Sequence, residues 1–128
     1  MYEEFNFRGL AMKKKVYLIC PVRNCSEEVQ KQLEDYVSDL ESNDYEVHFP
    51  PRDCKQDQSG IGICETHREA MVNCDEVHFW WDKDSKGSHF DFGMAFMLQA
   101  FSDIKFVIAG DIEETPHKSY GNVIRHLS

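Results

Sequence analysis

Short apolar runs alternate with segments of helical spacing along this chain of 128 residues. The apolar runs have the length and the β-branched and aromatic content of buried strands, and they cover residues 15–20, 45–49, 76–81 and 105–109. Apolar residues recur every three to four positions between 29 and 40, 61 and 74, 90 and 101, and 121 and 127, which predicts helices there. Asn24 or Ser26 can cap the first helix, and residues 52–60 read as a polar loop.

This alternation predicts an α/β fold with a doubly wound, mainly parallel sheet of four to five strands and helices on both faces, as in Rossmann-like proteins. The length suits a single domain over residues 1–128, with 1–14 as an N-terminal extension. In the strand order 2-1-3-4, the loops after the first and third strands lie side by side. We therefore expect residues 21–24 to lie beside the turn at 82–91.

That turn contains more polar side chains than a connecting loop requires, because it includes three aspartates, two serines and a histidine. Arg23, the Ser85 and Ser88 hydroxyls and a helix N-terminus could bind a phosphate, with the Asp91 carboxylate beside it. The competing interpretation is a solvated loop in which Asp91 only stabilises the helix dipole, by roughly 0.3–1 kcal/mol. In both cases we expect Asp91→Asn to change folding stability little.

The net charge of −9 argues against a nucleic-acid polymer as partner, although a small nucleotide needs only one or two local cations. The five cysteines form no C-x-x-C pair, and residues 1–12 lack the apolar segment of a signal peptide. Reduced thiols and a cytoplasmic location are therefore expected. The Cys and His spacings match no standard zinc pattern, and no apolar run approaches the length of a membrane span.

Two segments together resemble the nucleoside 2-deoxyribosyltransferase-like family. The first is Gly87-Ser88-x-x-Asp91-x-Gly93-x-Ala95, after a strand that begins Asp75-Glu76-Val77, and the second is Tyr17-Leu18-Ile19-Cys20-Pro21-Val22-Arg23-Asn24. The resemblance covers about residues 15–110. It implies a flavodoxin-like homodimer or larger homo-oligomer that breaks or exchanges the N-glycosidic bond of nucleosides or nucleotides, without a cofactor or metal.

The resemblance also implies roles for single residues. The family's catalytic glutamate falls on Asp91, which is one methylene shorter. Ser85 falls on the phosphate-binding serine of the branch that hydrolyses 2'-deoxynucleoside 5'-monophosphates, and Arg23 falls near its phosphate-loop arginine. His67 stands where many members have a substrate-positioning aspartate, and Tyr17 where an aromatic residue is common. The other substrate-binding candidates are Asn24, Asp82, Asp84, Gly87, Ser88 and His89.

Glycosidic cleavage passes through an oxocarbenium-like state at C1', which the Asp91 carboxylate could attack or stabilise. The departing base needs a proton or hydrogen bonds, and the candidates for that role are His67, His89, Asp82 and Asp84. Trp80 or Trp81 could stack on the base, with one of the two facing the core, and Arg52 or Asp53 could reach the ligand. The aspartate in place of glutamate also keeps an alternative open: a non-catalytic nucleotide-binding or sensing module, or an interaction protein with a degenerate pocket.

Overall fold

The computed structural model describes residues 13–55 and 59–128 and contains a four-stranded sheet of order β2-β1-β3-β4. All neighbouring strands are parallel, and their bounds are β1 Lys14–Ile19, β2 Tyr45–His48, β3 Glu76–Phe79 and β4 Lys105–Ile108. The central strands β1 and β3 are mostly buried, as expected for strands covered on both faces. The predicted α/β class and strand order are confirmed.

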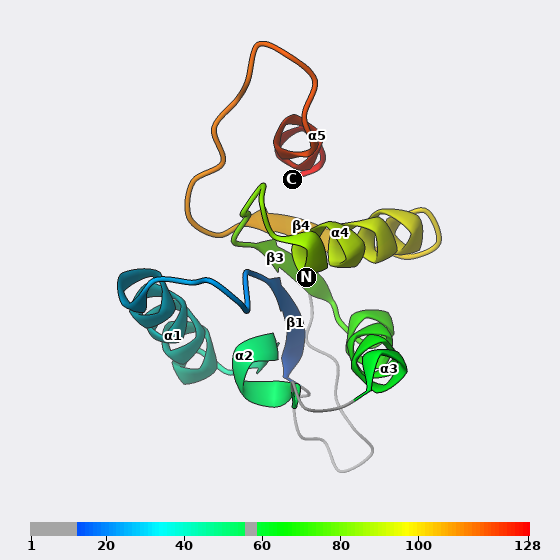
Figure 1. Ribbon diagram of the computed structural model, residues 1–128. Helices are drawn as coiled ribbons and strands as arrows, with labels where there is room; N and C mark the ends of the chain where they lie inside the picture. Colours follow the sequence, from blue (N-terminus) through cyan, green and yellow to red (C-terminus); the bar gives the residue numbers. More distant parts are fainter. Residues whose placement is uncertain (1–12, 56–58) are drawn as a thin grey trace.

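Helices cover both faces of this sheet (Figure 1). Their bounds are α1 Glu27–Ser42, α2 Pro50–Asp53, α3 Gly60–Val72, α4 Lys86–Gln99 and α5 Tyr120–Leu127. Helix α1 packs on one face, whereas α3, α4 and α5 lie on the other. The hydroxyl of Ser26, not Asn24, caps α1 by accepting a hydrogen bond from the Val29 amide.

Side chains of β1 alternate between the two cores, because successive residues of a strand point to opposite faces. Val16 and Leu18 pack under α1, in one core. Tyr17 and Ile19 lie in the other core, beneath α3 and α4. This alternation puts a phenol, Tyr17, in the core beneath α3 and α4.

Three of the expected helix and strand boundaries are wrong. Residues 50–53 form the short helix α2, although residues 52 and 53 were expected in a loop, and Pro50 suits its first turn because that position needs no amide donor. Helix α4 begins at Lys86, four residues before the expected start, because Ser85 caps it. Lys14 belongs to β1 and not to the expected N-terminal extension, of which residues 1–12 lie outside the described residues.

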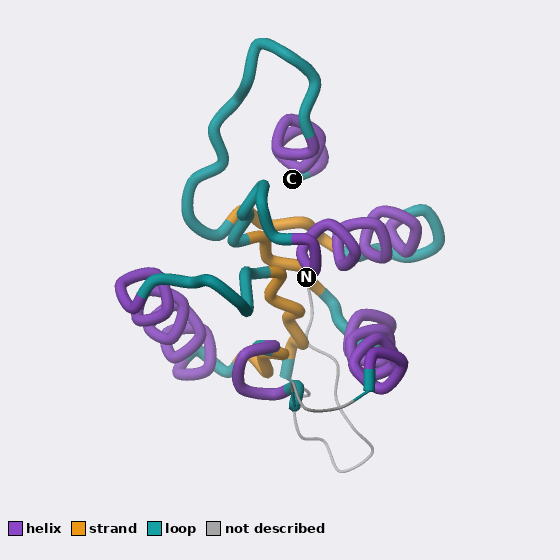
Figure 2. Tube along the Cα trace, in the orientation of Figure 1, coloured by secondary structure: helices purple, strands orange, loops and turns teal. Residues whose placement is uncertain are grey.

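The carboxyl ends of the four parallel strands share one edge, so the loops after β1 and β3 lie at the same end of the molecule (Figure 2). The candidate site is built at this end. In the described parts of the chain, no helix is long and apolar enough to cross a membrane.

Candidate active site

Asp91 is the sixth residue of α4 and therefore lies in the second helical turn. The first turn contains no acidic residue, and the Ser85 hydroxyl caps the helix by accepting a hydrogen bond from the Ser88 amide at 3.2 Å. A charge acts strongly on the helix dipole only within the first turn. The interpretation of Asp91 as a dipole-stabilising first-turn residue is therefore wrong.

The Asp91 side chain is buried at 7% exposure, against β1. The Tyr17 hydroxyl donates a hydrogen bond to its Oδ2 atom at 2.9 Å. Burial raises the pKa of Asp91 to about 6, while the Tyr17 hydrogen bond opposes this rise. No Lys or Arg within 13–55 or 59–128 forms an ion pair with this carboxylate. Asp91 is thus a buried anion at neutral pH that no described cation neutralises.

Two histidines, His67 and His48, continue the hydrogen-bonded contact of Asp91 with Tyr17 beyond the Tyr17 side chain. His67 of α3 places Nδ1 2.9 Å from the Tyr17 hydroxyl oxygen and 3.4 Å from Nε2 of His48. His48 pairs with Tyr17 in the β2–β1 register, and their ring centroids lie 4.9 Å apart. Because Tyr17 gives its single proton to ionised Asp91, its oxygen must accept from a protonated Nδ1 of His67.

The side chains of Tyr17, His67 and His48 are uncharged at neutral pH. Burial lowers the pKa of His67, and burial together with the neighbouring His67 lowers the pKa of His48 to about 4. Burial and the nearby Asp91 raise the pKa of Tyr17 far above neutrality. Ionised Asp91 therefore ends a hydrogen-bonded chain whose other three members, Tyr17, His67 and His48, are neutral.

Ser88 shares the sheet-facing side of α4 with Asp91, because residues three apart are neighbours on a helix. Its side chain is 1% exposed, and its Oγ has no hydrogen-bond partner among the described residues. An orphaned buried hydroxyl in this position can donate to a ligand. Gly87, one residue earlier, is exposed, and a Cβ built there would meet open space. The start of α4 thus holds a buried hydroxyl with no described partner, next to an exposed and unobstructed stretch of backbone.

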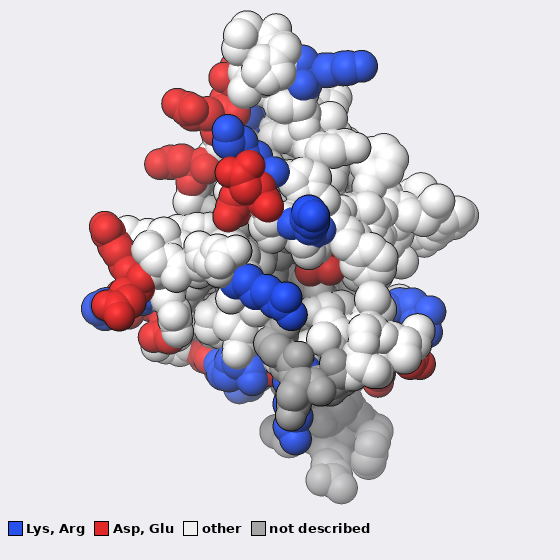
Figure 3. Space-filling view, viewed as in Figure 1, with Lys and Arg blue, Asp and Glu red and all other residues white. Residues whose placement is uncertain are grey.

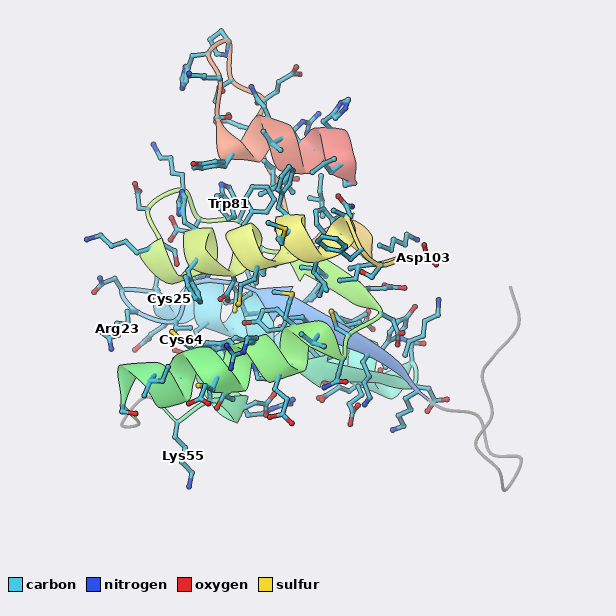
Figure 4. All side chains as sticks on the ribbon, turned by 90° about the vertical axis from the view of Figure 1, so that its right-hand side faces the viewer. Arg23, Cys25, Lys55, Cys64, Trp81 and Asp103 are labelled. Atoms are coloured by element: carbon cyan, nitrogen blue, oxygen red, sulfur yellow. The ribbon has the colours of Figure 1, made fainter. Side chains whose placement is uncertain are left out.

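The loop after β1 supplies a cation at the same end of the sheet. Arg23 is exposed and forms no ion pair with any residue of the described ranges. Asn24 has a positive φ of 56°, which turns the chain sharply before α1. Figure 4 shows Arg23, Cys25 and Cys64 at the end where α4 begins. Figure 3 views the molecule from that end. Basic side chains, in blue, surround a shallow hollow, and acidic atoms, in red, are visible at its bottom.

Within the described residues, three expected site residues form no hydrogen bond with the Asp91 side chain. His89 is two positions from Asp91, about 200° around the helix. Its Nδ1–H donates to the Ser85 carbonyl at 2.7 Å, and its ring packs against Trp81 and Tyr120. The other two form a local turn in which Asp82 Oδ1 accepts from the Asp84 amide, and Asp84 is exposed.

Other candidates for ligand contact are engaged in packing or ion pairs. Trp80 and Trp81 pack in different cores, as strand alternation predicts, and Figure 4 shows Trp81 in the region between α4 and α5. Arg52 is held by Glu41 at 3.0 Å and by Asp53 at 2.8 Å, so its charge is already compensated.

The sequence interpretation missed His48. It is a single polar residue at the end of a short strand, and only the pairing of β2 with β1 brings it beside Tyr17. Within the two described ranges, no cluster of His, Cys, Asp and Glu side chains could hold a metal ion.

Comparison with known proteins gives a structural likeness and no sequence match. No family model matches the chain, and no curated protein matches it by sequence. Its fold is similar to that of the CMP N-glycosidase BcmB of Clostridium botulinum, with a TM-score of 0.57 and 21% sequence identity. The match covers 90% of this chain and 83% of the other. The doubly wound parallel fold is therefore shared with an N-glycosidase.

Proposed function

We propose that this chain cleaves or exchanges the N-glycosidic bond of a nucleoside 5'-monophosphate, or of a nucleoside, with Asp91 acting at C1'. The observation that carries the proposal is the buried Asp91 carboxylate, which is held by the Tyr17 hydroxyl at the switch point of the sheet. Ligands bind at this point in open α/β sheets.

The chemistry requires a negative charge beside C1', because positive charge develops on the sugar as the base departs. Asp91 meets this need when it is ionised, and its surroundings of low polarity strengthen its attraction for the developing cation. The hydrogen bond from Tyr17 fixes one carboxylate oxygen, Oδ2, and in this proposal Oδ1 faces the sugar. A carboxyl pKa of about 6 leaves most of the group ionised at neutral pH.

A 5'-phosphate fits the start of α4. Its oxygens could accept hydrogen bonds from Ser88 Oγ and Ser85 Oγ, and the positive end of the helix dipole would favour its charge. Arg23 would complete the site with a charge-assisted contact. The substrate named for the structurally similar BcmB, CMP, is itself a nucleoside 5'-monophosphate, which supports the choice of this substrate class.

Incubation with a panel of ribo- and deoxyribonucleosides and their 5'-monophosphates, followed by chromatography for free base, tests the proposal. We expect base release from at least one monophosphate, and slower release from the matching nucleoside. Ligand-induced thermal stabilisation without base release would contradict catalysis and favour the nucleotide-sensing alternative.

The Arg23→Ala variant tests the phosphate assignment within the same panel. We expect the preference for monophosphate over nucleoside to fall by at least about tenfold, since a charge-assisted contact contributes more than about 1.4 kcal/mol. Lys118→Ala is the control, because it removes one exposed cation from the loop before α5 and leaves the loop after β1 intact. Equal rates on nucleoside and monophosphate in the unaltered protein would favour a transferase acting on nucleosides.

A further inference from the structure

His67 contacts the candidate active site through Tyr17 and not through Asp91 itself. Its Nδ1 atom lies 2.9 Å from the Tyr17 hydroxyl oxygen, and that hydroxyl in turn contacts Asp91 at 2.9 Å. The His67 side chain comes from α3 and is 9% exposed, whereas Asp91 belongs to α4. A neutral His67 therefore acts on the carboxylate through the Tyr17 hydroxyl.

We propose that His67 is a positioning residue: its Nδ1–H donates to the Tyr17 oxygen, which commits the single Tyr17 proton to Asp91. The inference rests on the proposed function. It gives His67 a role that differs from contact with the substrate, which the family resemblance implies for an aspartate at this position.

The donors and acceptors around Nδ1 fit one tautomer of His67. A neutral imidazole carries its proton on one nitrogen only, and burial lowers the pKa of His67. Both atoms near Nδ1 can accept its proton: the Tyr17 oxygen at 2.9 Å and Nε2 of His48 at 3.4 Å, of which the shorter makes the stronger hydrogen bond. With Nδ1 unprotonated, His67 and Asp91 would compete for the same Tyr17 proton.

The ring of His48 restricts the His67 ring to the orientation that this bond requires. His48 stands opposite Tyr17 in the pairing of β1 with β2. Its ring centroid lies 4.9 Å from that of Tyr17 and 5.6 Å from that of His67, and the two imidazole planes are nearly perpendicular, at 83°. The rings of Tyr17 and His67 also meet edge to face, at 6.1 Å. Three rings packed in this way limit the rotation of the His67 side chain.

A donor to the Tyr17 oxygen strengthens the hydrogen bond from Tyr17 to Asp91, because hydrogen bonds in a chain polarise one another. That second bond stabilises the charged carboxylate. The charge of Asp91 also acts on two thiols, Cys20 and Cys54, but burial raises the pKa of both, so they stay neutral. His67 therefore supports the anion without placing a competing positive charge beside it.

A double-mutant cycle on Tyr17 and His67 tests whether His67 acts through Tyr17. His67→Leu removes the donor, and Tyr17→Phe removes the hydroxyl that connects it to Asp91. In the protein without ligand, ¹³C NMR should show the Asp91 titration midpoint a few tenths of a pH unit higher in His67→Leu, and higher still in Tyr17→Phe. In the Tyr17→Phe background, His67→Leu should add no further shift.

Steady-state kinetics of the same four proteins separate positioning from contact with the substrate. His67→Leu should lower kcat by at least about threefold and leave KM unchanged, because it disturbs the reacting carboxylate and not substrate binding. The loss should be absent in the Tyr17→Phe background. His67→Asn offers an amide N–H in place of Nδ1–H and should recover most of the lost kcat. Thr66→Val is the control on α3, because it removes a hydroxyl that donates to the Gly62 carbonyl at 2.9 Å.

Equal Asp91 midpoints in His67→Leu and the unaltered protein would overturn the positioning role while the glycosidase stands. A loss of kcat that persists in the Tyr17→Phe background would do the same, and a raised KM in His67→Leu with full activity in His67→Asp would assign His67 to the substrate. The expected midpoints in a protein that releases no base from any substrate would overturn the proposed function alone. His67→Met, which also lacks a donor, replaces His67→Leu if the leucine variant does not fold.

Discussion

Asp91 is the residue on which the account depends, and its burial predicts an effect on stability. The carboxyl group has a folded pKa of about 6 and an ordinary value of 3.8. A raised carboxyl pKa means that the ionised form costs stability. The cost is absent below about pH 4, grows up to pH 6 and is complete above that value. The expectation of little change for Asp91→Asn is therefore replaced.

Asp91→Asn should stabilise the fold at pH 7.5 by an amount on the order of 2–3 kcal/mol, because one pKa unit corresponds to about 1.4 kcal/mol. The amide oxygen can still accept the Tyr17 hydrogen bond. Chemical denaturation at pH 7.5 and pH 4 measures the effect, and the gain should vanish at pH 4. An equal gain at both pH values would show that the charge is not its cause. Asp103→Asn, at an exposed position, is the control.

Tyr17→Phe should move the pH dependence of turnover. The Tyr17 hydrogen bond stabilises the charged form of Asp91 and so lowers its pKa. Without it, the pKa of Asp91 rises further above 6, and activity should begin to fall at a higher pH as the solution is acidified. A profile of kcat/KM between pH 5 and 8 measures the midpoint. An unshifted acidic limb would mean that Asp91 is not the group that must be ionised.

At the scale of the element, two serines at the start of α4 have different roles. Ser85 caps the helix, whereas Ser88 Oγ has no partner within the described residues. Ser85→Ala should cost about 1 kcal/mol of stability, the usual loss for a removed cap.

Ser88→Ala should leave stability unchanged or slightly higher, because it removes a buried hydroxyl that bonds to nothing described. It should raise KM for a monophosphate several-fold. Melting temperatures and steady-state kinetics of the two alanine variants distinguish helix capping by Ser85 from ligand binding by Ser88. A Ser88→Ala protein with lower stability and unchanged KM would assign that hydroxyl to the fold and not to the ligand.

At the scale of the whole molecule, α4 carries an apolar stripe on its outer side. Phe90 and Met97 are 51% and 63% exposed and lie seven positions apart, on one side of the helix, and Phe101, which is 80% exposed, follows just beyond its C-terminal end. We expect this stripe to pair two copies of the chain. Light scattering should give the mass of a dimer, and Met97→Glu should give a monomer of 15.0 kDa. A monomeric unaltered protein would contradict this expectation.

The sheet was predictable from sequence because each strand is a short, dense apolar run between polar breaks. Its order followed from the alternation of strands and helices. The start of α4 was misplaced because residues 86–89 are polar or glycine, and only the Ser85 cap marks the boundary. His48 could not be assigned to the site, because its contact with His67 depends on how α3 packs across β1 and β2.

The most direct measurement of the central claim is base release by the unaltered protein and its Asp91 variants on one 5'-monophosphate. We predict measurable free base from the unaltered protein and a loss of several orders of magnitude for Asp91→Asn, with nucleotide binding retained in a thermal-shift assay. Asp91→Glu should keep part of the activity, since it retains the carboxylate one methylene further out. Equal base release by the unaltered protein and Asp91→Asn would contradict the account.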